Sequence, residues 1–325
     1  MKVVELRKLL RQADRVNLEN AFVEAYKALH KNEKAAVDPT LESLLTGKPL
    51  KKKPPETVDY SQLDKEIETF IWNAKEQNYC APNRIISKSQ RPKWRFLVKN
   101  YIKELSQVAL DNPYYPQAVQ RLRELYQLIC LACDYCLFST EDPFRSIGWA
   151  QHLFYDLLAK QTFAMGYNRE NISTMLLCAV TGGVSREALH SFMERVLLSE
   201  LKTLKSKQMA VEEAKKLVDQ ASAQVKKESA YSSRRYDLEN EVRELCNFIW
   251  MFALDQSRLE EGLDYYFGNC MERNEEISLY RVLYTAGETG TKEQWLETYA
   301  YGLQRGIKPR EYLQEQYKEM QEEGK

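Results

Sequence analysis

The sequence is poor in glycine and proline and has no long apolar run. Only 12 glycines and 10 prolines occur in 325 residues, and they fall between periodic segments rather than within them. No apolar stretch approaches the ~18 residues that a membrane-spanning helix needs. The first residues alternate charged and apolar side chains, which is typical of neither a signal peptide nor a membrane anchor. We therefore expect a cytoplasmic protein that does not bind membranes.

Motifs for phosphate, dinucleotide or zinc binding are also missing, as is the nucleophile elbow of hydrolases. The chain has three histidines, and none belongs to an H-E-x-x-H motif. His152 and Asp156 are one helical turn apart, so they favour either an acid/base pair, two metal ligands or a contact on a helix surface. Since a metal needs further ligands, we interpret the pair as a surface contact. We expect no metal, no cofactor and no catalytic residue.

Neither sign of charge dominates. Lysine and arginine together number 47, as do aspartate and glutamate, while 44% of residues are hydrophobic and 29% are charged. This composition is typical of a folded protein with a sizeable core and not of a disordered chain. Net charge by itself therefore predicts no polyanionic partner.

Apolar residues repeat at three and four positions along most of the chain, and nowhere do they alternate at two. The sequence therefore predicts an all-α protein without a β-sheet, in which helical hairpins pack as an irregular array similar to HEAT or tetratricopeptide repeats. No fixed repeat period supports a repeat family. The predicted parts are an N-terminal helical segment (1–46), a Lys/Pro linker (47–58), a central helical domain (59–184) and a C-terminal region of hairpins (185–325).

One helix, expected over 116–138, becomes apolar around nearly its whole circumference toward its C-terminal end. We predict that it forms the core of the central helical domain (59–184). Asp134 lies within this apolar end, and a buried carboxylate needs a partner. We expect Asp134 to be buried and paired with a basic side chain from the segment 91–95.

Cys130, Cys133 and Cys136 form a C-x-x-C-x-x-C pattern that matches part of an iron–sulfur motif. The fourth ligand is missing, because Thr140 stands where the motif would have cysteine. On a regular helix, Cys136 would also point about 120° away from Cys130. We therefore expect reduced thiols, most of them buried, for the seven cysteines.

The densest basic stretch runs from residue 84 to residue 103 and contains no acidic residue. Its cations could attract phosphates while aromatic side chains stack on unpaired bases. Alternatively, Trp94 and Tyr101 belong to a buried stripe, while the cations form the solvated face of the helix and pair with acidic neighbours elsewhere in the fold. This is the interpretation that we favour. The candidate binding residues are Arg84, Lys88, Arg91, Lys93, Trp94, Arg95, Lys99 and Lys103.

Two segments, RPKWRFLVKNYIKEL and LACDYCLFSTEDPF, are similar to those of bacterial all-helical proteins that are grouped as a family of unknown function. The resemblance extends over about residues 1–180 and rests on the general residue pattern and the order of the helices. It implies a bacterial, cytoplasmic protein. It implies no activity, cofactor or site residue.

Together these patterns favour a non-enzymatic helical scaffold whose partner is another protein. The alternative is a nucleic-acid-associated protein that uses the basic stretch. A second alternative is an intracellular enzyme with an unrecognised site, which would require a pocket where several ionisable groups converge. The sequence predicts no oligomeric state.

Overall fold

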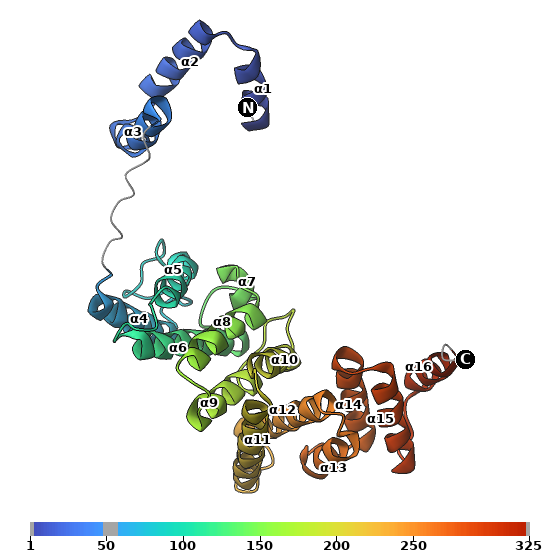
Figure 1. Cartoon of the computed structure of the whole chain (residues 1–325). Coiled ribbons are helices and arrows are strands. Elements are labelled where there is room, and N and C mark those ends of the chain that lie inside the picture. The colour runs from blue at the N-terminus through green and yellow to red at the C-terminus, as the bar shows by residue number, and fades with distance from the viewer. Residues whose placement is uncertain (1–2, 48–57, 323–325) are drawn as a thin grey trace. The chain divides into compact units, whose positions relative to one another are not determined.

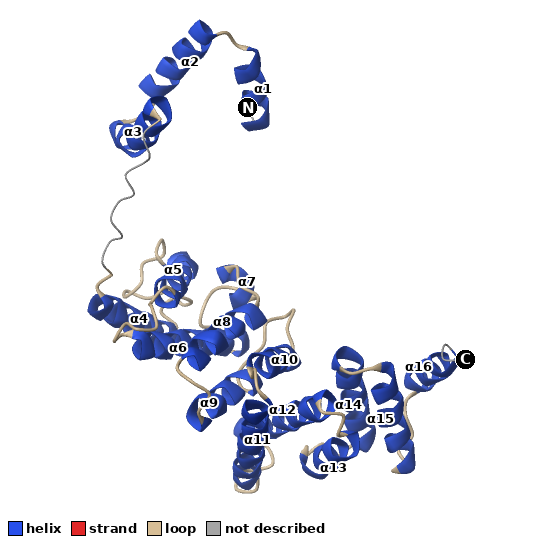
Figure 2. Ribbon diagram, viewed as in Figure 1, coloured by secondary structure: helices blue, strands red, loops and turns tan. Residues whose placement is uncertain are grey.

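The computed structural model describes residues 3–47 and 58–322. Within these ranges it consists of sixteen α-helices and one short 3-10 helix, with no strand (Figure 2). The all-α prediction is confirmed. The chain divides into two compact units, Met1–Val58 and Asp59–Lys325. The predicted linker, residues 47–58, lies outside the described residues except at its two ends.

The first unit contains three helices, α1 (Val3–Gln12), α2 (Arg15–Lys27) and α3 (Lys31–Thr46). Asp14 caps α2 by accepting a hydrogen bond from the backbone N–H of Asn17. Gly47 ends α3 in the left-handed conformation, at φ +68°. None of the side chains described in this unit is fully buried. The large apolar side chains that it exposes are Leu6, Leu9, Leu10, Val16, Phe22, Val23, Leu44, Leu45 and Val58.

The second unit begins with α4 (Tyr60–Lys75), the 3-10 helix η1 (Arg91–Lys93), α5 (Trp94–Ser106), α6 (Tyr115–Asp134), α7 (Pro143–Ile147), α8 (Gln151–Ala164) and α9 (Arg169–Val180). It continues with α10 (His190–Glu200), α11 (Leu204–Val225), α12 (Ser233–Asp255), α13 (Leu259–Asn269), α14 (Glu275–Thr289), α15 (Lys292–Gln304) and α16 (Glu311–Glu322).

Helices close in sequence pack against each other along this unit (Figure 1). The most extensive pairing is the hairpin of α11 and α12, and α12 also packs on α13 and α14. The likeness to HEAT or tetratricopeptide arrays stays a prediction. The predicted division at residue 184 falls inside this compact unit and also stays a prediction.

The most completely surrounded helix is α12, in which every residue from Leu245 to Leu254 is buried. Trp250 is fully buried and donates a hydrogen bond from Nε1 to the Val282 carbonyl of α14. Helix α13 lies close to α12 at Gly262, where an added Cβ would stand 2.3 Å from the Cβ of Ala253. Because only glycine permits this approach, Gly262 sets the distance between the two helices.

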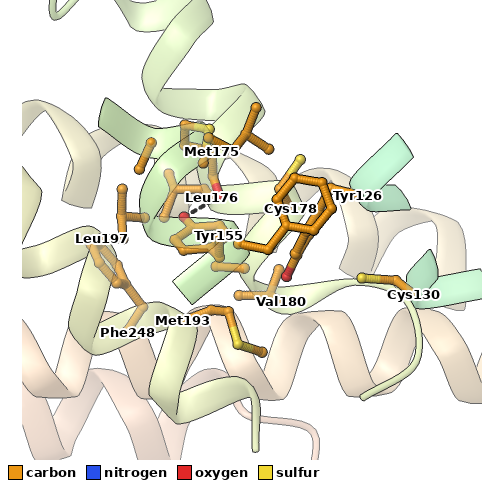
Figure 3. Close-up of a cluster of buried hydrophobic side chains, with 14 of the residues drawn as sticks. Tyr126, Cys130, Tyr155, Met175, Leu176, Cys178, Val180, Met193, Leu197 and Phe248 are labelled. Atoms are coloured by element: carbon orange, nitrogen blue, oxygen red, sulfur yellow. Dashed lines mark hydrogen bonds between the residues drawn. The ribbon is translucent and has the colours of Figure 1, made fainter. Parts of the chain in front are cut away.

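Helix α6 also contributes to the core, with half of its 20 residues buried. Its Tyr126 belongs to a cluster with side chains of α8, α9, α10 and α12 (Figure 3). In the same cluster, the hydroxyl of Tyr155 donates to the Met175 carbonyl at 2.8 Å. Each buried tyrosine hydroxyl or indole N–H that finds such a partner avoids a desolvation cost of about 1–3 kcal/mol.

The predicted end of α6 was wrong by four residues, because the helix stops at Asp134 and not at residue 138. The chain turns there so that Phe138 can stack on Trp94, with ring centroids 4.0 Å apart. This tertiary contact joins the segment that follows α6 to the first residue of α5. It also fixes how the basic stretch lies on the second unit.

Among the described residues, no helix combines the length and apolar character needed to cross a bilayer.

Candidate nucleic-acid interface

The loop that opens the basic stretch is held by its own hydrogen bonds. Asn83 accepts at Oδ1 from the backbone N–H groups of Ile85 and Ile86, at 2.9 and 2.7 Å. The guanidinium of Arg91 donates to the carbonyls of Ile86 and Asn83, at 3.1 and 3.2 Å. Arg91 is therefore a structural residue of the loop, and the loop it braces presents Arg84 to solvent.

Helix α5 separates its apolar and basic residues onto two faces. Trp94, Val98, Tyr101, Ile102 and Leu105 are buried, at the spacing of three and four that marks one side of a helix. Arg95, Lys99 and Lys103 follow each other at intervals of four on the exposed side. The predicted buried stripe and solvated cationic side are thus both present.

We use the name basic face for the exposed cations of this region together with the exposed ring of Phe96. Its members are Arg84, Lys88, Lys93, Arg95, Phe96, Lys99 and Lys103. Among the described residues, the single ion pair of these cations joins Lys103 Nζ to Glu104 Oε1 at a long 3.8 Å. The expectation that the cations pair with acids elsewhere is wrong for the described part of the chain, and their charge is available to a ligand.

The aromatic side chain available for stacking is Phe96 and not Trp94. Trp94 is 4% exposed and lies against Phe138, so its inclusion among the candidate binding residues was wrong. Phe96 is 57% exposed, and the guanidinium carbon of Arg95 lies 5.0 Å from the centre of its ring. An exposed ring with an adjacent guanidinium is a surface on which a base can stack.

Asp134, predicted to be buried and paired with the segment 91–95, is exposed at the last position of α6. Although exposed, it has a raised pKa, caused first by partial loss of hydration and then by the charge of Asp237, while His190 lowers it. Among the described residues, no hydrogen bond or ion pair joins Asp134 to Arg91, Lys93 or Arg95. The prediction failed because α6 ends at Asp134, so this side chain is not enclosed by helix packing.

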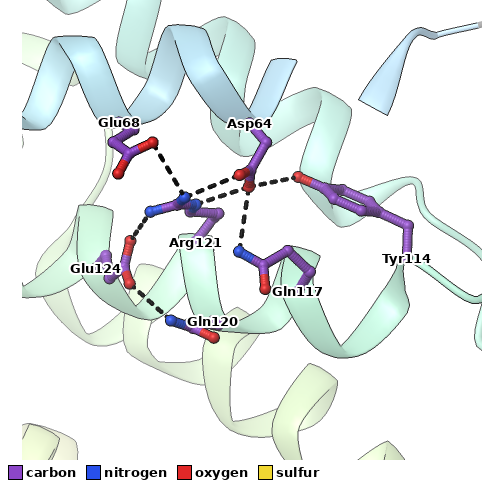
Figure 4. A network of polar contacts seen from close by, with 7 residues as sticks. All are labelled: Asp64, Glu68, Tyr114, Gln117, Gln120, Arg121 and Glu124. Atoms are coloured by element: carbon purple, nitrogen blue, oxygen red, sulfur yellow. Dashed lines mark hydrogen bonds and ion pairs between the residues drawn. The ribbon is translucent and has the colours of Figure 1, made fainter. Parts of the chain in front are cut away.

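A second concentration of charge joins α4 to α6 (Figure 4). Arg121 donates from Nε and Nη2 to the two carboxylate oxygens of Asp64, at 2.7 and 2.9 Å, and from Nη1 to Glu124 at 2.7 Å. The hydrogen bonds from Arg121 lower the pKa of Asp64 to about 2. Tyr114, which donates to the same carboxylate, has its pKa raised to about 12, chiefly by burial.

This network borders a groove of about 630 Å³ between α4, α6 and α9, which includes the half-exposed Trp72. Arg121 of α6 is shared between Asp64 of α4 and Glu124 of α6. The network therefore joins α4 to α6.

A smaller cavity of about 330 Å³ lies between α10, α12 and α14, beside a buried acid. Glu194 is fully buried and accepts a hydrogen bond from Asn247 Nδ2 at 2.6 Å, and Thr285 donates to Asn247 Oδ1 at 2.7 Å. Burial, followed by the nearby charge of Glu244, raises the pKa of Glu194 well above its usual range. The proton thus favoured on Glu194 keeps an unpaired charge out of the core.

Residues of the His152–Asp156 pair and of the cysteine pattern make contacts with other parts of the fold. Asp156 pairs with Lys160, and the ring of His152 meets that of Phe192 edge to face. Cys130 is buried, Cys133 donates to the Ile129 carbonyl, and Cys136 lies beyond the end of α6. Within residues 3–47 and 58–322, no group of three or more histidine, cysteine or acidic side chains is placed to hold a metal.

No family model, curated protein or solved structure matches the chain.

Proposed function

We propose that the chain binds single-stranded nucleic acid through the basic face. The observation that carries this proposal is a set of exposed cations, of which Lys103 alone has an acidic partner among the described residues, next to the exposed ring of Phe96. Acidic side chains are absent from the whole stretch 84–103. The alternative that ranked second on sequence grounds thus becomes the first.

Electrostatics supports a local site on a chain that is neutral overall. The formal net charge is zero, so long-range attraction to a polyanion is weak, and salt screens it beyond about 10 Å at 0.1 M. Phosphates that lie directly on the basic face release counterions, which is the main source of affinity for nucleic acids. The first turn of α5 contains no acid that would oppose this attraction.

Phe96 favours unpaired bases over a duplex. In a duplex the faces of the bases are covered by their neighbours, while a single strand can place a base on an exposed ring. Stacking of this kind is worth about 1–3 kcal/mol per base and depends little on sequence. We therefore expect low sequence specificity, and we include a cytoplasmic location in the proposal because free thiols stay reduced there.

Reversing two charges of the basic face tests the proposal. We expect Arg95→Glu/Lys99→Glu to weaken binding of a fluorescent single-stranded oligonucleotide at least about 30-fold, because two attractions become two repulsions. Both residues are exposed, so the fold should be kept, which circular dichroism checks. Fluorescence anisotropy at fixed salt measures the affinity.

The matched control is Lys226→Glu/Lys227→Glu, which changes net charge equally at two exposed lysines just beyond α11. It should change the affinity less than about threefold, because these residues are not part of the basic face. If both variants lost the same affinity for the oligonucleotide, the effect would come from the change in net charge and not from the basic face. Tighter binding of a duplex than of the single strand would contradict the assignment to unpaired bases.

Protein interaction is the second proposal, and the first unit favours it. Its helices expose large apolar side chains to solvent, and Leu44 and Leu45 are each 76% exposed. Apolar surface of this kind is a common basis for association between helices. Charge reversal on the basic face would leave such an interaction unchanged, so the same variants separate the two proposals.

A further inference from the structure

Two thiols of the second unit that are not buried lie side by side. Cys80 is half-buried in the loop after α4, and Cys136 is exposed just beyond α6. Their sulfur atoms are 2.9 Å apart, although the residues are 56 positions apart in the chain. A disulfide requires an S–S distance of about 2.05 Å, so a movement of about 0.9 Å would suffice.

Contacts of the surrounding structure hold both cysteine segments in place. The backbone N–H of Cys80 donates to the Gln77 carbonyl at 2.9 Å, which closes the turn after α4. On the other side, Phe138 anchors the segment of Cys136 by stacking on Trp94 and lying 5.8 Å from the ring of Tyr79. Tyr79 precedes Cys80 directly, so the aromatic contact and the sulfur contact join the same two segments.

The other five cysteines are poorly placed for oxidation. Cys130, Cys178, Cys246 and Cys270 are buried, and Cys133 is half-buried. Burial raises the pKa of Cys133 to about 12 and that of Cys178 to about 11, which keeps these thiols protonated and unreactive. Among the seven cysteines, all within the described residues, no other two sulfur atoms are in hydrogen-bond contact.

We propose that Cys80 and Cys136 form a reversible disulfide when the protein meets hydrogen peroxide. The thiolate of one residue attacks a peroxide oxygen, the O–O bond breaks, and a sulfenic acid forms while the released hydroxide is protonated to water. The second sulfur attacks the sulfenic sulfur and displaces a second water. In total, two thiols lose two protons and two electrons, and hydrogen peroxide is reduced to two waters.

The bridge would enclose the whole basic face, since residues 84–103 lie between positions 80 and 136. It would limit the freedom of this segment in the unfolded chain and so raise the temperature of unfolding. The pKa of Cys136 is raised, chiefly because the hydrogen bond with Cys80 favours its protonated form. Oxidation should therefore become faster as pH rises.

The test treats the reduced full chain with hydrogen peroxide, alkylates the remaining thiols and maps the peptides by mass spectrometry. The expected result is a peptide that links Cys80 to Cys136, alkylation of the other five of the seven cysteines, and reversal by dithiothreitol. The thermal midpoint should rise by about 5 °C or more in the oxidised chain.

Two variants with circular dichroism like the wild type complete the experiment. Cys136→Ser should form no intramolecular bridge, while Cys133→Ser should form it as the wild type does. The proposal is overturned if Cys80 and Cys136 remain fully alkylated after oxidation, if the link runs to Cys133, or if Cys136→Ser still loses two thiols within one chain.

Discussion

Arg121→Met is expected to lower the free energy of unfolding by about 3 kcal/mol at pH 7. The side chain of Arg121 is 12% exposed, and it neutralises Asp64 and Glu124 at 2.7 Å each. Removing one partner of a largely buried ion pair leaves the other charge uncompensated, which costs about 3–5 kcal/mol when burial is complete. Urea denaturation of the two proteins measures the difference.

The exposed ion pair of Arg186 and Glu141 provides the control, because its side chains are 66% and 81% exposed. Arg186→Met should cost less than about 1 kcal/mol. If both substitutions had equally small effects, the network in Figure 4 would not contribute to stability as we infer.

The same network gives a signature at acid pH. Because the pKa of Asp64 is about 2 in the folded chain against an ordinary 3.8, its stabilising contribution is complete above the ordinary value. It is lost as pH falls through about 2. We expect this loss, roughly 2 kcal/mol, in the wild type and not in Arg121→Met.

Glu194→Ala is expected to be about as destabilising as Arg121→Met, at roughly 3 kcal/mol. The substitution leaves a cavity in the core and removes the acceptor of Asn247 Nδ2. Glu194→Gln keeps an acceptor for Asn247 and has nearly the same volume, so it should retain the fold. Urea denaturation distinguishes the two variants.

The dependence on pH separates the acid from its neutral analogue. The pKa of Glu194 is raised in the folded chain, so its contribution is fully present below the ordinary value of about 4.3 and is lost as pH rises through the folded value. Glu194→Gln should therefore become more stable than the wild type as pH increases. Glu187→Gln, at an exposed position, should show no such trend, and equal pH profiles for all three proteins would refute a buried acid.

The helical spacing of apolar residues was sufficient to predict the fold class and the buried face of α5. The side chains of Trp94, Val98 and Ile102 repeat at helical spacing and all lie in the core. The local sequence pattern predicts which face of a helix is buried, because apolar residues at helical spacing lie on the side that packs against the core. The surrounded helix α12 had a comparable signal, an almost unbroken apolar run from Leu245 to Leu254, which was not recognised.

Contacts between distant residues could not be predicted in this way. Asp64 meets Arg121, Glu194 meets Asn247, and Cys80 meets Cys136 across 53 to 57 positions. A helical period states which face is buried but not which neighbour covers it. For the same reason the sequence could not show that Trp94 packs on Phe138 and leaves stacking to Phe96.

The salt dependence of nucleic-acid binding tests the central claim most directly. A plot of log affinity against log salt has a slope of about −0.7 per phosphate contacted on a single strand. If the six cations of the basic face all contact phosphates, the slope for the wild type is about −4. It should become shallower by at least about 1.4 in Arg95→Glu/Lys99→Glu, whereas Phe96→Ala should weaken binding at nearly unchanged slope. A flat plot for the wild type, or the same slope in the charge-reversed variant, would contradict the assignment of the basic face.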